Sequence, residues 1–377
     1  MRHTTTALAA ALLQLLFVQA ALSQDNSALI AEAVRPLPAD LRDDATVYTY
    51  DSATGERTIL RQGNNQVECT PNNPETGFTR CYARVDSARR DLAARLVAQG
   101  RSDEETSAAI AEAEAAGTIP PATPGAIRYR IYDGDDRIRF LWVVTLPNAT
   151  PEQLGMSTAP QRDNALAGQG LPWMMREGTP EAHLMIPVNG TAYSNPGGAR
   201  ARLDTKIIDD PIEQATLPLP EDLRADATVV RYNSQTGARE VLRQGSNMIE
   251  CQPRNAETGF TMCYHRDRGP EQDLRARLAA EGKSDEDVAA AVQSALASGE
   301  LKPPPFGSLA YRLYEEDDRL KLLWVMLLPN ATADELGMSV ASQRDAALAG
   351  EGLPWMMLEG TPSAHLMIPI NATELSN

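Results

Sequence analysis

Basic residues are scarce in this chain: 35 lysines and arginines stand against 51 aspartates and glutamates, and the formal net charge is −16. Nucleic acids and anionic lipids attract basic surfaces, so this balance disfavours both as partners. Beyond the N-terminal region, no segment approaches the roughly 18 consecutive apolar residues of a membrane span. We therefore expect no nucleic-acid partner and no membrane span.

Motifs that mark common enzyme classes are also missing. The chain has no Gly-x-Ser-x-Gly elbow, glycine-rich phosphate loop, His-Glu-x-x-His helix or haem-attachment motif. These absences favour a non-catalytic protein over an enzyme.

The N-terminus has the pattern of a secretion signal. A short basic start precedes an apolar stretch from Ala7 to Leu22, and small residues lie just before Gln24. We expect residues 1–23 to be a signal peptide, residues 24–35 to form an N-terminal segment, and the mature chain to be soluble and secreted or periplasmic. Its acidic surface attracts cations or basic proteins, or it simply keeps an exported chain in solution.

Only four cysteines occur, as two pairs with eleven residues between the members of each. An even count in an exported chain predicts two disulfides, Cys69 to Cys81 and Cys251 to Cys263. Closing so short a loop stabilises the fold by about 3 kcal/mol in the chain-entropy model. Zinc is the competing use, but the spacing is not C-x-x-C and no histidine flanks both pairs.

The strongest pattern is an internal duplication. Residues 36–189 and 218–371 align without a gap at a shift of 182 positions, and more than half of the aligned residues are identical. We expect two tandem repeat domains, a linker at 190–217 and a tail at 372–377. Identity is densest from Leu146 to Asn189, which indicates that the C-terminal third of each copy is the most constrained, although recent gene conversion gives the same pattern.

The N-terminal part of each copy has the pattern of strands. Alternation over Thr46–Tyr50 and Thr58–Arg61, with Gly55 between them, predicts a β-hairpin. Short apolar segments around Cys69 and Cys81 predict two further strands joined by the disulfide.

The pattern then becomes helical. Leu92, Leu96 and Val97 form an apolar stripe, and Ser102–Glu105 is typical of a capping box that opens a second helix. The second copy repeats these features with Leu274, Leu278, Ser284–Asp287, Val288, Val292 and Ala295. We therefore expect an αα-hairpin in each copy.

A second hairpin follows, formed by Tyr129–Tyr132 and Ile138–Leu146. Its acidic turn, Asp133–Asp136, corresponds to Glu315–Asp318 in the second copy. Calcium is one possible occupant, but the spacing of a calcium loop is missing and a solvated turn is the default interpretation.

Each copy ends with a polar helix and a strand. The helix is expected through Gln161 to Ala167, and Ala182–Pro187 has the pattern of a strand buried on both faces. The whole domain is therefore expected to be α+β, with β-hairpins, an αα-hairpin and a C-terminal buried strand.

Two short stretches resemble motifs of uncharacterised exported bacterial proteins. They are Leu60–Gly63 with Cys69 and Cys81, and Gly178–Pro187 far downstream. The resemblance implies a bacterial envelope setting and carries no known activity.

Histidine, methionine and tryptophan gather in the last third of both copies. If Ala182–Ile186 is a strand, His183 and Met185 share one face, and Trp173 lies nearby. Imidazole, thioether and indole groups suit Cu(I). The candidate ligands are Met174, Met175, His183 and Met185, with Met356, Met357, His365 and Met367 in the second copy. The competing interpretation is ordinary core packing, with a hydrogen-bonded structural histidine.

A serine hydrolase is the second alternative. Ser157, His183 and Asp163 or Glu177 supply a nucleophile, a base and an orienting acid. The matching residues of the second copy are Ser339, His365, Asp345 and Glu359. The simpler interpretation of Arg162–Asp163 is a local ion pair or a helix cap.

The leading hypothesis is a non-catalytic exported protein whose two copies pair within the chain, as a covalently linked dimer, and bind an external ligand or partner. The Asn-x-Thr sequons at Asn148, Asn189, Asn330 and Asn371 are then loop residues of a bacterial protein rather than glycan sites.

Overall fold

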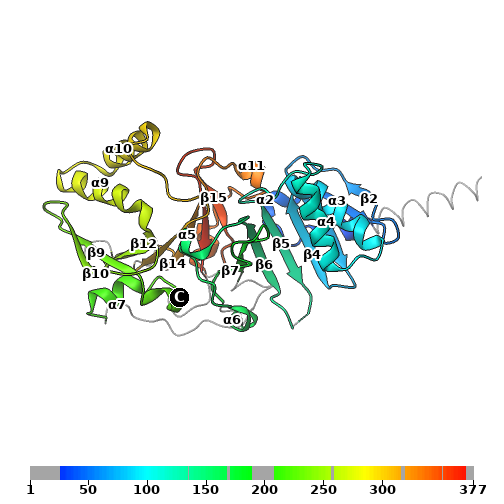
Figure 1. Ribbon diagram of the computed structural model, residues 1–377, viewed down its shortest axis with the longest axis horizontal. Helices are drawn as coiled ribbons and strands as arrows, with labels where there is room; N and C mark the ends of the chain where they lie inside the picture. The colour runs from blue at the N-terminus through cyan, green and yellow to red at the C-terminus, as the bar shows by residue number, and fades with distance from the viewer. Residues whose placement is uncertain are drawn as a thin grey trace, which may run out of the picture. The chain divides into compact units, whose positions relative to one another are not determined.

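The computed structural model describes residues 26–134, 136–167, 170–188, 208–255, 259–315, 319–349 and 351–370 (Figure 1). The predicted signal peptide, most of the predicted linker and the whole of the predicted tail lie outside these residues. None of the helices in the described ranges has the length and apolar character that crossing a membrane requires.

Each copy forms one eight-stranded mixed sheet, and the two sheets have the same strand order. The order is β2-β1-β3-β4-β5-β6-β8-β7 in the first copy and β10-β9-β11-β12-β13-β14-β16-β15 in the second. In both, the first strand pairs parallel with the third. The predicted α+β fold in two tandem copies is confirmed.

The strands of the first sheet match the expected segments and add one. They are β1 Thr46–Tyr50, β2 Arg57–Arg61, β3 Val67–Asn73, β4 Phe78–Ala83, β5 Ile127–Tyr132, β6 Phe140–Thr145, β7 Trp173–Met175 and β8 His183–Pro187. The added strand is β7, which pairs antiparallel with β8.

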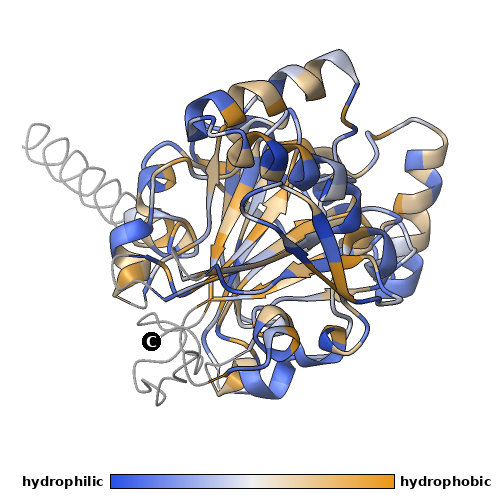
Figure 2. Ribbon diagram, turned by 90° about the vertical axis from the view of Figure 1, so that its left-hand side faces the viewer, coloured by the Kyte–Doolittle hydropathy of each residue, from blue (hydrophilic) through white to orange (hydrophobic). Residues whose placement is uncertain are grey.

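The second sheet repeats this set. Its strands are β9 Thr228–Tyr232, β10 Arg239–Arg243, β11 Ile249–Gln252, β12 Phe260–His265, β13 Leu309–Tyr314, β14 Leu322–Leu327, β15 Trp355–Met357 and β16 His365–Pro369. Apolar residues concentrate on the strands, whereas the helices carry many hydrophilic residues (Figure 2).

The helices lie between and beside the strands. In the first copy they are α2 Ala39–Arg42, α3 Ser87–Ala98, α4 Asp103–Ala115, α5 Pro151–Leu154 and α6 Arg162–Leu166. In the second they are α7 Pro211–Thr216, α8 Glu221–Arg224, α9 Gly269–Ala280, α10 Asp285–Ser298, α11 Ala333–Leu336 and α12 Arg344–Leu348. The αα-hairpins are α3–α4 and α9–α10, and the capping box at Ser102 and Glu105 is present.

Both predicted disulfides are present, joining directly opposite residues of neighbouring strands. A short helix covers each of them. The Sγ of Cys81 lies 3.3 Å from the Ala33 carbonyl oxygen, within a helix at 26–33, and the Sγ of Cys263 lies 3.2 Å from the Ala215 carbonyl oxygen in α7. These helices precede residues 36 and 218, where the sequence identity between the copies begins.

The expected apolar stripe of α3 is not a buried one. No residue of α3 is fully buried, and Val97 is 58% exposed. The equivalent stripe of α9 is not buried either, because Leu274 and Leu278 are only partly covered. In α10, Val288, Val292 and Ala295 are buried as expected.

Two compact units divide the chain differently from the repeats. The first consists of residues up to 120 together with 130–133, and the second consists of 121–129 together with residues from 134 onward. The second unit therefore contains β6, β7 and β8 of the first copy as well as the whole of the second copy.

Candidate functional site

Reciprocal hydrogen bonds join the two copies inside the second unit. The hydroxyl of Tyr129 donates to the carbonyl of Gly337 at 2.6 Å, and the hydroxyl of Tyr311 donates to the carbonyl of Gly155 at 2.5 Å. Both tyrosines are completely buried. They are equivalent residues of the two copies, as are the two glycines, so the contact has the reciprocity of a two-fold interface.

Two further glycines permit a close approach at the same junction. Gly125 and Gly307 are equivalent, and both have the left-handed backbone conformation, with φ of 87° and 88°. A Cβ on Gly125 would lie 2.9 Å from the Leu336 Cδ1, and a Cβ on Gly307 would lie 2.7 Å from the Leu146 Cδ2. The left-handed backbone favours glycine at both positions, and any larger residue would also displace a leucine side chain of the other copy.

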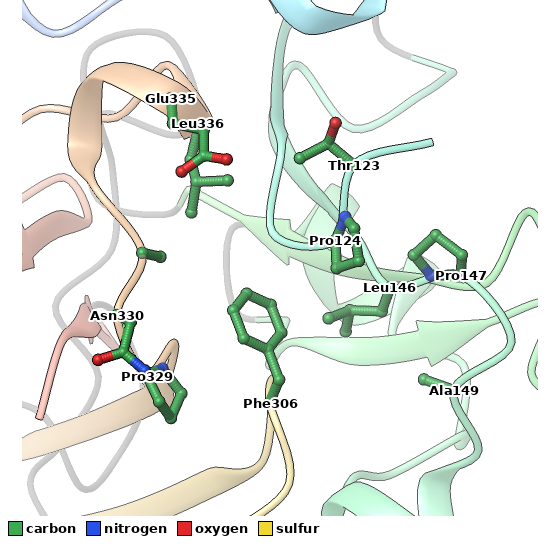
Figure 3. Close-up of a pocket in the computed structure, with 11 residues that line it drawn as sticks. Thr123, Pro124, Leu146, Pro147, Ala149, Phe306, Pro329, Asn330, Glu335 and Leu336 are labelled. Atoms are coloured by element: carbon green, nitrogen blue, oxygen red, sulfur yellow. The ribbon is translucent and has the colours of Figure 1, made fainter. Parts of the chain in front are cut away.

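An open groove of about 450 Å³ lies at this junction (Figure 3). Its lining residues come from both copies. The first copy contributes Thr123, Pro124, Leu146, Pro147 and Ala149, and the second contributes Phe306, Pro329, Asn330, Ala331, Glu335 and Leu336. Among the described residues the lining is mostly apolar, and its polar side chains are Thr123, Asn330 and Glu335. The Phe306 ring lies between the two sides (Figure 3).

Glu335 distinguishes the two copies. In α5, Thr150 and the equivalent Gln153 form a reciprocal capping box. In α11, Thr332 accepts a hydrogen bond from the Glu335 backbone N–H at 3.3 Å, but no return bond from the carboxylate occurs among the described residues. The carboxylate instead lines the groove.

The other two polar side chains of the groove are also available to a ligand. Neither the Thr123 hydroxyl nor the Asn330 amide hydrogen-bonds to another side chain or backbone group in the described ranges. Asn330 has a φ of 63°, a left-handed conformation that asparagine tolerates. A carboxylate, an amide and a hydroxyl thus converge on an apolar groove, which is the usual composition of a small-molecule site.

The predicted copper ligands divide between the two faces of the terminal hairpin. Met175 lies directly opposite His183 in the β7–β8 pair, and Trp173 lies opposite Met185. These residues share one face. Met174 pairs with Leu184 on the other face and is 1% exposed, whereas Met175 is 39% exposed.

The second copy shows the same division. Met357 is opposite His365, Met356 is opposite Leu366, and Trp355 is opposite Met367. The structure therefore brings one histidine and two methionines together on one face in each copy and separates Met174 and Met356 from them.

Both histidine rings are held by a local hydrogen bond. The Nδ1 of His183 lies 2.6 Å from the Glu181 carbonyl oxygen, and the Nδ1 of His365 lies 2.7 Å from the Ser363 carbonyl oxygen. A carbonyl only accepts, so Nδ1 carries the proton and Nε2 is the nitrogen with the lone pair. Burial lowers the pKa of His365, which favours the neutral ring in the folded state.

The residues of the hydrolase hypothesis have other partners. The Ser157 hydroxyl donates to the Asp222 carboxylate at 2.8 Å, so its proton faces a carboxylate rather than an imidazole. The Asp163 and Asp345 side chains are 96% and 98% exposed beside Arg162 and Arg344. Of the remaining candidates, Ser339 is buried and its hydroxyl oxygen accepts from the Ala341 N–H. Glu359 accepts from the Ala333 N–H at the start of α11, and Glu177 is exposed.

The acidic turns are engaged in protein contacts where they are described. Asp133 accepts hydrogen bonds from Arg35 and Asn72, and Glu315 accepts one from Arg254. Asp135 and residues 316–318 lie outside the described ranges. Within those ranges, no three His, Cys, Asp or Glu side chains are grouped as metal ligands.

A charged network beneath each αα-hairpin was not anticipated from the sequence. In the first unit, Arg57 pairs with Glu68 and with Asp91, both at 2.8 Å, and the Tyr50 hydroxyl donates to Asp91 at 2.7 Å. The second copy repeats the arrangement with Arg239, Glu250, Asp273 and Tyr232.

The network fixes α3 to its sheet by polar contacts. Glu68 is almost fully buried, and its carboxylate also accepts a hydrogen bond from Ser87. The residues that form the network are identical in the two copies, and this identity is the feature of the sequence that could have indicated it. Because Glu68 and Asp91 are both paired with Arg57, we assign the network a structural role.

Comparisons with known proteins give no guide to the function of this groove or of the terminal hairpins. No protein-family model, no curated protein and no solved structure matches this chain.

Proposed function

We propose that this chain is an exported, non-catalytic binding protein that holds a small apolar ligand with a protonated amine in the groove between its two copies. The observation that carries the proposal is the groove itself. Its apolar lining comes from both copies, and at its side lies the Glu335 carboxylate, which has no partner among the residues that the structure describes.

The size and rigidity of the groove support this proposal. Its volume of about 450 Å³ falls within the range of small-molecule sites. Pro124, Pro147 and Pro329 restrict the backbone around it. A preformed groove orders few groups when a ligand binds, so less of the binding free energy is lost to conformational entropy.

Charge selects the ligand class. Glu335 is the only ionisable residue among the described residues of the lining, and the chain carries a net charge of −16, so a cation is favoured over an anion. Because Glu335 is solvent-exposed, its ion pair with an amine should contribute only about 0.2–1 kcal/mol. The apolar lining supplies the affinity, and Glu335 supplies a preference of a few-fold.

The disulfides support export, because paired cysteines persist in oxidising compartments such as the periplasm or the extracellular space. The hydrogen bond from Ser157 to Asp222 supports a non-catalytic role, since it directs the serine proton to a carboxylate and not to the imidazole that a serine triad uses as its base.

The first test compares two probes of nearly equal size, 4-phenylbutylamine and 4-phenylbutanol, by ligand-observed NMR titration of the mature chain. We expect both to bind and the amine to bind a few-fold more tightly. Ala149→Trp, which fills the groove, should abolish binding of both. Equal binding of each probe to the wild type and to Ala149→Trp would contradict the proposal.

Glu335→Gln gives the matched variant, because it places in α11 the residue that caps α5. The fold should be retained, the preference for the amine should disappear, and binding of the alcohol should be unchanged. Gln153→Glu is the control: residue 153 does not line the groove, so neither probe should respond.

A further inference from the structure

We propose that each copy carries a Cu(I) site on one face of its terminal hairpin, formed by Met175, His183 and Met185 in the first copy and by Met357, His365 and Met367 in the second. This inference is independent of the groove.

The strand register brings the three ligands within reach of one ion. Residues directly opposite in an antiparallel pair have Cβ atoms about 4.5–5.5 Å apart, which applies to Met175 and His183. Met185 follows His183 by two residues on the same face, about 6.6 Å along the strand. Methionine has three rotatable bonds, so both thioethers can turn towards the imidazole.

The histidine is prepared for coordination through Nε2. Its Nδ1 hydrogen-bonds to a backbone carbonyl in both copies, and metal-binding histidines commonly donate their second ring N–H in this way. The hydrogen bond also fixes the orientation of the ring. The same local contact in the two copies indicates that the geometry belongs to the hairpin rather than to one sequence variant.

The neighbouring side chains suit a soft ion. On β6, Thr145 is the register partner of His183 and Val143 is the register partner of Met185. Met185 packs in a core cluster with Val143 and Trp173. The positive charges of Arg312 and Arg268 also act electrostatically on His365. They disfavour a doubly charged cation, while thioether and imidazole ligands favour the singly charged, soft Cu(I).

Exposure separates Met175 and Met357 from ordinary core methionines. Met174 is buried, as expected of a residue that fills the core, but the adjacent Met175 is 39% exposed and its counterpart Met357 is 40% exposed. Packing alone does not account for an exposed methionine opposite a histidine in both copies. Both lie on the last strand of their sheet, which gives an ion a direct route from solvent.

The test is an anaerobic titration of the mature, disulfide-bonded chain with Cu(I), against a competing chromophoric chelator. We expect about two Cu(I) per chain for the wild type, one for His183→Gln and none for the double variant His183→Gln/His365→Gln. X-ray absorption of the loaded chain should show both sulfur and nitrogen neighbours.

Methionine variants make the test specific to one face of the hairpin. Met175→Leu/Met357→Leu changes exposed side chains, should fold normally, and should weaken Cu(I) binding at least tenfold. The control Met174→Leu/Met356→Leu changes the neighbouring residues on the other face and should bind as the wild type does.

The proposal is overturned if the wild type does not compete with the chelator, if the histidine variants keep two Cu(I), or if both methionine pairs respond alike.

Discussion

Tyr129 and Tyr311 each satisfy a backbone carbonyl of the other copy from a fully buried position. Burial raises the pKa of Tyr311 well above 10, so the hydroxyl stays protonated and can donate. Tyr311→Phe removes the donor and leaves the Gly155 carbonyl unpaired, which should lower the free energy of unfolding by about 1–3 kcal/mol.

Urea denaturation measures this loss, with Tyr314→Phe as the control. Tyr314 lies on the same strand, β13, and its hydroxyl makes no hydrogen bond within the described residues. Its replacement should change stability by less than about 0.5 kcal/mol. Equal effects of the two variants would show that the inter-copy hydrogen bond contributes nothing.

His265 makes the stability depend on pH. It is completely buried in the second copy, its Nδ1 accepts from the Asp267 N–H, and its ring adjoins Gly155. Burial lowers its pKa below the ordinary 6.5, while the Asp267 carboxylate and the Gln153 backbone oppose this shift and Arg266 adds to it. The neutral ring is therefore favoured in the folded state.

The unfolded chain takes up the proton first as the pH falls below about 6.5. The contribution of His265 to the free energy of unfolding is therefore complete above about pH 6.5. It is lost as the pH falls towards the lower pKa of the folded state, at a rate of at most about 1.4 kcal/mol per pH unit. His265→Ala, which gives the residue of the first copy, Ala83, should flatten the dependence of unfolding free energy on pH between 7 and 5. If the variant kept the wild-type dependence of unfolding free energy on pH, His265 would not be its cause.

Features that depend on neighbouring residues in the sequence could be predicted from it. The period of two places His183 and Met185 on one face, and an even cysteine count identifies both disulfides. The bond from Ser157 to Asp222 could not be predicted, because it joins residues 65 positions apart. The sequence alternation also does not show which of Met174 and Met175 shares a face with His183. That assignment depends on the pairing of β7 with β8.

At the scale of elements, short-range signals identified the hairpins and the αα-hairpins. The apolar stripe of α10 is buried as expected, but that of α3 is not, because the network around Arg57 and Glu68 holds α3 by polar contacts. A helical period detects an apolar face without showing whether it is covered. Strand β7, only three residues long, has too few residues for any period to be detected.

The disulfides link neighbouring strands of the sheets, and each closes a short loop. Replacing Cys251 and Cys263 by alanine should lower the free energy of unfolding by about 3 kcal/mol, chiefly because the unfolded chain gains freedom. Urea denaturation of the variant under oxidising conditions measures the change. The wild type in reducing agent should lose about twice as much; no loss in either case would contradict this stabilising role.

At the scale of the whole molecule, duplication predicts two sheets of the same topology, and this is confirmed. The groove could not be predicted, because its two sides come from segments around residues 123–149 and 306–336. Each segment alone looks like a proline-containing loop. The reciprocal contacts of Gly125 and Gly307, together with the tyrosine hydrogen bonds between the copies, make them one surface.

The most direct measurement is a set of intermolecular nuclear Overhauser effects between the phenyl protons of 4-phenylbutylamine and the methyl groups of a selectively labelled mature chain. Leu146 and Leu336 line the groove from different copies. We predict contacts from the bound phenyl ring to both leucines. Contacts to neither, with the probe instead near other methyl groups, would contradict the proposal that the junction of the two copies is the ligand site.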